Sequence, residues 1–567
     1  MQTSDTPSHD SVLSEDVVFR HSHSHTTTAV AVSAFLTACG GGAGGSNVSG
    51  GASIAPASAQ AARFLHQAQF SANDADIADV VAKGYSSWLA EQVSAPASTT
   101  GWDWQIAQGY NTVASVNNIA PADYMMWQQL ISSSDSVRKR MALALSEIFV
   151  VSSSGVSVSS RSFAMAQYWD VLVAGAFGNY RSLLEEITLN PAMGVYLNTK
   201  GNQKTNVAAG RAPDENYARE VLQLFSIGLY ELNLDGTNKL ASGAPIETYS
   251  QSDITSLAKV FTGWDYDTAG STAVNPTSVR NRMVLTASLH ETTATTFLGT
   301  TIAANTFGAA ALGLALDAIF NHANVAPFIS KQLIQRLVTS NPSTAYVARV
   351  AAIFNNNGSG VRGDLKAVLG AVLLDTEARD DANITSGTWG KQREPMLRLV
   401  QWARTFGATS AAGQWIVGDL SDMGTRLGQS PLRSGSVFNF FRPGYVLPNS
   451  ALAAQSLVSP EFQLTNESTA AGYLNFMLGT VKSGFNVANG GLNPPSYATE
   501  LALVGNLPTL LARLNLLLCA GQLSSATLAT IQTALATMSI STAANQQSVV
   551  SAAIFLVMAS PEYVIQK

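Results

Sequence analysis

Apolar residues recur every three or four positions through most of this chain, the spacing that places them on one face of an α-helix. Strict alternation of apolar and polar residues, which indicates half-buried strands, hardly occurs. The pattern predicts a mainly α protein, a large irregular multi-helix domain. The ranges with helical spacing are 61–70, 73–93 with an interruption at Gly84, 122–131, 136–151, 163–177, 180–188, 213–227, 251–263, 309–321, 325–338, 343–355, 362–374 and 391–406.

One minor β-hairpin element is expected between Leu232 and Tyr249. Two short alternating runs flank Asp235-Gly236 there, and Asp-Gly is a dipeptide that suits a tight hairpin turn.

Two similar tetrapeptides are interpreted as helix starts and not as sites. Ser459-Pro460-Glu461-Phe462 and Ser560-Pro561-Glu562-Tyr563 each offer a serine N-cap, a proline for the first helical position and a glutamate for the first turn.

The helix predicted over residues 213–227 carries the densest polar face in the chain. Pro213 suits the first helical position, because its missing N–H has no partner there in any case. Asp214 places negative charge at the positive end of the helix dipole, and Gly228 supplies a stop.

At about 100° per residue, the polar face of this helix gathers Glu215, Asn216, Arg219, Glu220 and Gln223. Glu215 with Arg219 and Asn216 with Glu220 are pairs four residues apart, which are neighbours on a helix surface. One alternative, without a catalytic role, is a solvent-exposed helix face with ordinary surface ion pairs. The other alternative is a catalytic one, in which the face forms the wall of a cleft and Arg219 keeps one carboxylate ionised while the other carries a proton.

Other residues could complete such a site. Asp253, His290 or Glu467 could supply the second catalytic group, since Glu215 and Glu220 lie about 140° apart around the helix and need not face one substrate. Trp264 and Gln223 are candidates for substrate binding. The sequence leaves open whether Trp264 is a core anchor or a platform on which a sugar ring stacks.

Composition excludes several classes of function. The net charge of −6 and the absence of a Lys/Arg-rich run argue against a nucleic-acid partner. The sequence indicates no metal site and no cofactor, because it lacks CxxC and HExxH motifs, a Walker loop and a dinucleotide-binding fingerprint. No GxSxG elbow marks a serine hydrolase either.

The N-terminal region has the order of a lipoprotein precursor. Residues 26–38 form an uncharged, mostly apolar run that ends in Leu36-Thr37-Ala38-Cys39-Gly40, which resembles a lipobox. The expected organisation is a removed signal segment over 1–38, an acylated Cys39 with a Gly/Ser/Ala-rich tether over 39–59, and a helical domain over 60–567 that could divide into two packed subdomains near 265–305. We therefore expect an exported lipoprotein of the cell envelope, anchored to the membrane through Cys39.

Nine segments together resemble the bacterial family called domain of unknown function 1800, DUF1800. They are AARFLHQAQF from Ala61, VRKRMALALSEIFVVS from Val137, NPAMGVYLN from Asn190, DENYAREVLQLFSIGLYELN from Asp214, FTGW from Phe261, HANVAPFISKQLIQRLVTSNPS from His322, KQREPMLRLVQW from Lys391, SVFNFFRPGY from Ser436 and SPEY from Ser560. The resemblance covers nearly everything after the tether.

The resemblance implies no established activity or cofactor. By analogy it implies a partner protein from the family called domain of unknown function 1501. Relatives tend to have Glu where this chain has Gln223. They often show His-Asp, then a lysine, then Phe-Leu-Gly, where this chain has His290-Glu291 and then Thr295 or Thr296 before Phe297.

Two hypotheses of function follow. The first is an extracytoplasmic hydrolase that uses carboxylate acid/base chemistry on the polar face of helix 213–227. The second is a non-catalytic cell-surface binding or assembly lipoprotein that acts with a partner and exposes aromatic residues in SVFNFFRPGY.

Overall fold

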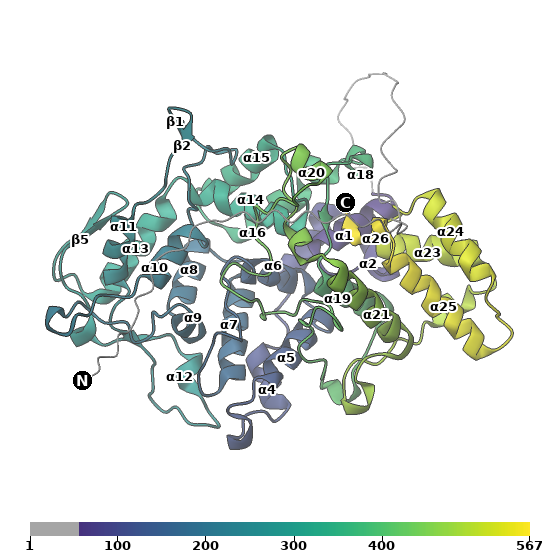
Figure 1. Cartoon of the computed structure of the whole chain (residues 1–567), viewed down its shortest axis with the longest axis horizontal. Coiled ribbons are helices and arrows are strands. Elements are labelled where there is room, and N and C mark those ends of the chain that lie inside the picture. Colours follow the sequence, from purple (N-terminus) through teal and green to yellow (C-terminus); the bar gives the residue numbers. More distant parts are fainter. Residues whose placement is uncertain (1–55) are drawn as a thin grey trace, which may run out of the picture. The chain divides into compact units, whose positions relative to one another are not determined.

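The computed structural model of the chain describes residues 56–567 and is mainly α, as the spacing of apolar residues predicts (Figure 1). The predictions for residues 1–55, including lipidation at Cys39, lie outside the described residues. The first half contains α1 Ser58–Ala68, α2 Asp74–Lys83, α3 Tyr85–Ser94, α4 Gly101–Ala107, α5 Ala120–Ile131, α6 Ser136–Ser146, α7 Arg161–Gly175, α8 Tyr180–Thr188, α9 Pro191–Tyr196, α10 Asn216–Gln223, α11 Gln251–Val260 and α12 Thr277–Arg280.

Helices continue to the end of the chain. They are α13 Gly308–Asn321, α14 Val325–Leu337, α15 Thr344–Asn355, α16 Leu365–Leu374, α17 Thr376–Arg379, α18 Ala382–Thr385, α19 Pro395–Phe406, α20 Ala451–Ala454, α21 Glu467–Ser483, α22 Ala498–Ala502, α23 Leu507–Cys519, α24 Ser525–Ala536, α25 Ala543–Met558 and α26 Pro561–Val564. Short 3₁₀ helices lie at Val113–Ser115, Val207–Ala209, Ala287–Leu289, Ala411–Gly413, Pro460–Leu464 and Val487–Asn489.

Within residues 56–567 the strands form antiparallel pairs, and each strand is short. These are β1 Leu240–Ala241 with β2 Ala244–Pro245, β3 Trp264–Asp265 with β4 Val284–Leu285, β5 Thr295–Phe297 with β6 Thr300–Ile302, and β7 Lys391–Gln392 with β8 Ile565–Gln566. The predicted hairpin region holds β1 and β2, and Leu232 also bridges Asn238 across the Asp235-Gly236 turn. The other pairs lie outside the range predicted for β structure.

The central helix is shorter than predicted. Pro213 lies outside it. The segment before α10 is held in place by Asn202, because the backbone N–H of Asp214 donates a hydrogen bond to Oδ1 of Asn202 at 2.9 Å. The carboxylate of Asp214 then accepts from the N–H of Asn216, the first helical residue, at 2.8 Å. Gly228 adopts φ 72°, which suits the predicted stop although the helix itself ends at Gln223.

Two further boundaries differ from the prediction. Residues 391–392 form β7 instead of the first turn of a helix, because they pair with residues 565–566 at the other end of the chain. Helix α6 ends at Ser146, and Glu147 is its C-terminal capping residue. Both differences place charged residues at the ends of elements, where their side chains can meet those of other segments.

One hydrophobic core runs through the described residues and continues on both sides of 265–305. Its largest buried side chains include Trp127, Trp169 and Trp402. Helix α14 packs on α6, α15 and α16, and α23, α24 and α25 pack on one another (Figure 1). Within residues 56–567 no single helix is long and apolar enough to cross a bilayer, and α13 with α14 would do so only as a pair bent by 71°.

Candidate functional site

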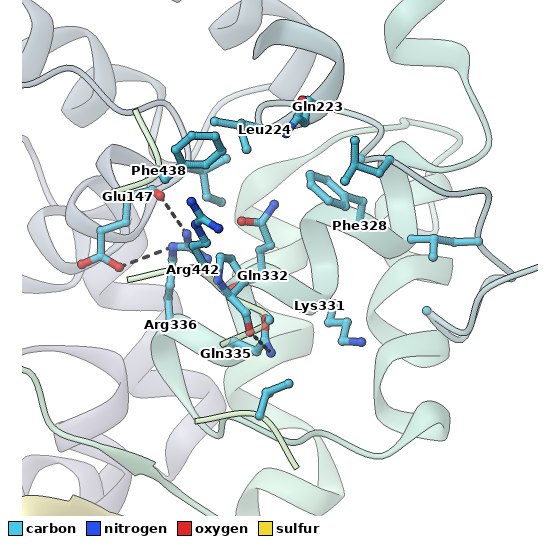
Figure 2. A pocket seen from close by; sticks show the side chains of 18 of the residues that line it. Glu147, Gln223, Leu224, Phe328, Lys331, Gln332, Gln335, Arg336, Phe438 and Arg442 are labelled. Carbon is cyan, nitrogen blue, oxygen red and sulfur yellow. Dashed lines mark hydrogen bonds and ion pairs between the residues drawn. The ribbon is translucent and has the colours of Figure 1, made fainter. Parts of the chain in front are cut away.

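A cavity of about 430 Å³ lies between the ends of α6 and α10, one face of α14 and the loop 437–444 (Figure 2). Most of its wall is apolar and includes Leu224, Phe328 and Phe438. Gly228 lies against the ring of Phe328, where an added Cβ would come within 2.7 Å of Cε2. A largely apolar cavity with a few polar groups is the usual form of a small-molecule site.

Glu147 and Arg336 form the polar end of this cavity (Figure 2). Nε of Arg336 lies 3.4 Å from Oε2 of Glu147, and both side chains are only 4% exposed. Nη2 of Arg336 also donates to the backbone carbonyl of Glu147 at 2.7 Å. Because Glu147 caps α6 and Arg336 lies in the last turn of α14, the pair joins the C-terminal ends of two helices.

A buried charge cluster continues behind this pair. Lys391 pairs with Glu461 at 2.9 Å and with Glu394 at 3.9 Å. Lys391 and Arg140 both donate to the backbone carbonyl of Arg336, at 2.7 and 2.6 Å. The members of the buried charge cluster are Arg140, Glu147, Arg336, Lys391, Glu394 and Glu461. Three cations and three carboxyl groups are thus gathered inside the protein, where an unpaired charge is costly.

Burial raises the pKa of Glu147 to about 8. Glu394 shifts this pKa in the same direction, whereas Arg336, Lys391 and Arg140 oppose the shift, and the value of about 8 is the net result. At neutral pH the side chain of Glu147 is therefore mostly a neutral carboxyl group, which can donate as well as accept a hydrogen bond. Burial also raises the pKa of Glu461 and lowers the pKa of Arg336.

Polar atoms without hydrogen-bond partners gather at this end of the cavity. Within residues 56–567, neither carboxyl oxygen of Glu147 has one, and the same holds for Nε2 of Gln332 and Nε of Arg336. All three side chains line the cavity. Buried polar groups are normally paired, so this arrangement indicates a place where water or a ligand atom completes the bonding.

Two of the residues predicted from the polar face of the central helix border a second, more polar cavity of about 260 Å³. Arg219 and Gln223 line it together with Tyr249 and Gln251. Arg219 lies 3.4 Å from Glu215, and these side chains are 40% and 32% exposed. Part of the polar face therefore lines a cavity, and its side chains are partly exposed to solvent. This result lies between the two alternatives that the sequence left open, a solvated face and a cleft wall.

The carboxyl groups of that face do not meet at either cavity. Glu215 is held by Nε2 of Gln251 and Oγ1 of Thr255, both at 2.7 Å. Glu220 is buried, Oε2 has no hydrogen-bond partner in the described part of the chain, and burial raises its pKa while Arg219 opposes the shift. Neither residue lines the two cavities, and Asn216 does not either.

The remaining candidates from the sequence line neither of the two cavities. Their contacts are those of helix caps, core side chains or exposed residues. Asp253 completes a capping box at the start of α11 and accepts from the N–H of Leu298. His290 is buried with Nδ1 2.9 Å from the carbonyl of Thr262. Trp264 is 5% exposed in β3, which favours the core-anchor alternative over a stacking platform. Glu467 is exposed at the start of α21.

Sequence reasoning missed Glu147, Arg336 and the charges behind them. A signal was present, since single charged residues interrupt the apolar runs ALALSEIFVV and QLIQRLV. The interpretation of Ser459-Pro460-Glu461-Phe462 as a helix start alone is incomplete. Glu461 is 2% exposed and pairs with Lys391, and Ser459 makes no capping hydrogen bond. Residues 56–567 contain no cluster of His, Cys, Asp and Glu that could hold a metal ion.

Comparison with known proteins gives one match. Neither the curated proteins nor the solved structures include a match to this chain. The family model described as protein of unknown function, DUF1800, matches residues 63–565. Segments from 137, 214, 322, 391 and 436, which resemble that family, supply residues to the large cavity or to the charge cluster behind it. Because the match covers nearly the whole chain, this protein belongs to the DUF1800 family.

Proposed function

We propose that the large cavity is the active site of an extracytoplasmic hydrolase in which Glu147 acts as the general acid. One observation carries the proposal: the Glu147 carboxyl group, whose pKa burial raises to about 8, lines a largely apolar cavity, where it faces Nε of Arg336 at 3.4 Å. A carboxyl group that lies in a cavity and has a strongly shifted pKa is a candidate for a functional site. Glu147 thus replaces Glu215 and Glu220 as the preferred acid.

The chemistry uses the groups at the polar end of the cavity. Glu147 protonates the leaving-group oxygen or nitrogen while a water molecule attacks, and it recovers a proton from that water. Nε2 of Gln332 is a further donor for the oxygen on which negative charge develops. Arg336 also fixes the position of Glu147 through the bond to its backbone carbonyl.

Replacing Glu147 with glutamine should lower kcat/KM about a hundredfold or more, because glutamine keeps the shape but cannot give up a proton. In the native protein, kcat/KM should fall as the pH rises through about 8, where Glu147 loses its proton. Hydrolysis of chromogenic esters, amides and glycosides by the purified protein measures both effects. The matched control is Glu467→Gln at an exposed site, which should leave hydrolysis unchanged. Full activity in Glu147→Gln would rule out the role of Glu147.

A second candidate is a binding or assembly lipoprotein without catalysis, acting with a partner protein. It is favoured by the absence of a second carboxyl group among the residues that line the large cavity within the described part of the chain. Many hydrolases divide acid and base duties between two carboxyl groups. A protein that binds a ligand in the cavity but hydrolyses none of the substrates above would support this candidate.

We also propose that Cys39 anchors the protein to the cell envelope. The support is the order of the apolar run, the Leu-Thr-Ala-Cys sequence and the glycine-rich tether. The variant Cys39→Ser should move the protein from the membrane fraction to the soluble fraction of cells, as detected by immunoblotting. Cys519→Ser is the control, since that thiol is buried in the core. A Cys39→Ser protein that stays in the membrane fraction would contradict the anchor.

A further inference from the structure

The large cavity and the more polar cavity beside it share two lining residues, Gln223 and Leu229. Leu229 contributes an apolar side chain, and Gln223 contributes an amide whose Oε1 accepts from the hydroxyl of Tyr249 at 3.3 Å. Gln223 makes no other side-chain hydrogen bond within residues 56–567. Its amide nitrogen can therefore donate a hydrogen bond to a ligand at the junction between the large cavity and the more polar cavity.

The polar cavity has the composition of a site for a neutral, hydroxyl-rich group. Arg219 and Glu247 are its charged lining residues, and their formal charges cancel. Its remaining polar groups include the hydroxyls of Tyr230 and Tyr249, whose rings can also cover the apolar face of a sugar. Arg219 already binds Glu215 and Gln251, at 3.4 and 3.2 Å, so its guanidinium is partly committed.

We propose that the two cavities form one bipartite site for an amphiphile with a neutral, hydroxyl-rich head. The apolar segment lies against Leu224 and Phe328 in the large cavity, and the head lies in the polar cavity beside Tyr249 and Arg219, with Gln223 at the junction. This inference rests on the proposed function in one respect, that the large cavity is where the ligand is bound. The class of ligand, an amphiphile with a neutral head, goes beyond the proposed function.

Titration calorimetry with octyl β-glucoside below its critical micelle concentration tests the bipartite site. The native protein should bind this probe saturably and at least tenfold more tightly than it binds either glucose or octanoate. Tyr249→Phe should weaken binding severalfold, because it removes one hydroxyl that can form a hydrogen bond with the head. Leu224→Trp should weaken it more than tenfold by filling the apolar cavity. The matched control Tyr266→Phe, which lies outside both cavities, should bind as the native protein does.

Three outcomes would overturn the bipartite site: no saturable binding of octyl β-glucoside, binding unaffected by Tyr249→Phe, or octanoate bound as tightly as the glucoside. Glu147→Gln separates this inference from the proposed function. If the glucoside binds as predicted while Glu147→Gln retains full hydrolysis, the bipartite site stands and the acid role of Glu147 falls. If Glu147→Gln abolishes hydrolysis while the glucoside does not bind, the acid role stands and the bipartite site falls.

Discussion

Replacing Lys391 with methionine should reduce the free energy of unfolding by about 3–5 kcal/mol, the usual cost of removing one partner of a buried ion pair. Methionine keeps most of the volume but removes the ammonium group that lies 2.9 Å from Glu461 and 3.9 Å from Glu394. It also removes the hydrogen bond to the carbonyl of Arg336. Two buried carboxyl groups would then lack their nearest cation.

Chemical denaturation followed by circular dichroism measures this loss. Adding Glu461→Gln to Lys391→Met should restore part of it, since the double variant no longer buries that unpaired carboxylate. Lys482→Met, on the exposed face of α21, is the control and should change stability by less than about 1 kcal/mol. A Lys391→Met protein as stable as the native one would show that the buried charge cluster does not hold these segments together.

The native protein should lose up to about 4 kcal/mol of stability relative to Glu147→Gln as the pH rises from about 5 to about 8. The pKa of Glu147 is about 8 in the folded protein and 4.5 in a model peptide, so between these values the folded state holds a proton that the unfolded state releases. The contribution of this proton to stability is complete below the lower pKa. It is lost as the pH rises through the higher one.

Denaturation midpoints of both proteins at several pH values measure this difference. Comparison with Glu147→Gln cancels the contributions of other buried acids, such as Asp170, whose pKa burial raises to about 6. If the difference between the two proteins does not change over this range, Glu147 is ionised in the folded state at neutral pH.

Much of the fold can be predicted from the sequence because helical periodicity is a local property. The predicted helix over 180–188 coincides with α8, and the break at Gly84 separates α2 from α3. The errors arise where distant segments compete with local preference. Residues 391–392 have helical spacing but pair with residues 565–566, and Pro213 lies outside α10 because Asn202 binds the residue that follows it.

The candidate site was only partly predictable for the same reason. Arg219 and Gln223 could be found because a single helix places them on one face, and both line a cavity. The bond between Arg336 and Glu147 spans 189 residues, so no local pattern could pair them. Glu220 shows the limit of a helical projection: it shares the polar face yet is buried away from both cavities.

The Glu147 carboxyl group should be protonated at neutral pH within the large cavity. Infrared difference spectra between the native protein and Glu147→Gln, recorded across a pH titration, test this protonation most directly. We expect a protonated-carboxyl band from Glu147 at pH 7 that disappears with a midpoint near pH 8. A band already absent at pH 7, with a midpoint near the ordinary glutamate pKa of 4.5, would show that Glu147 is ionised in the folded protein at neutral pH.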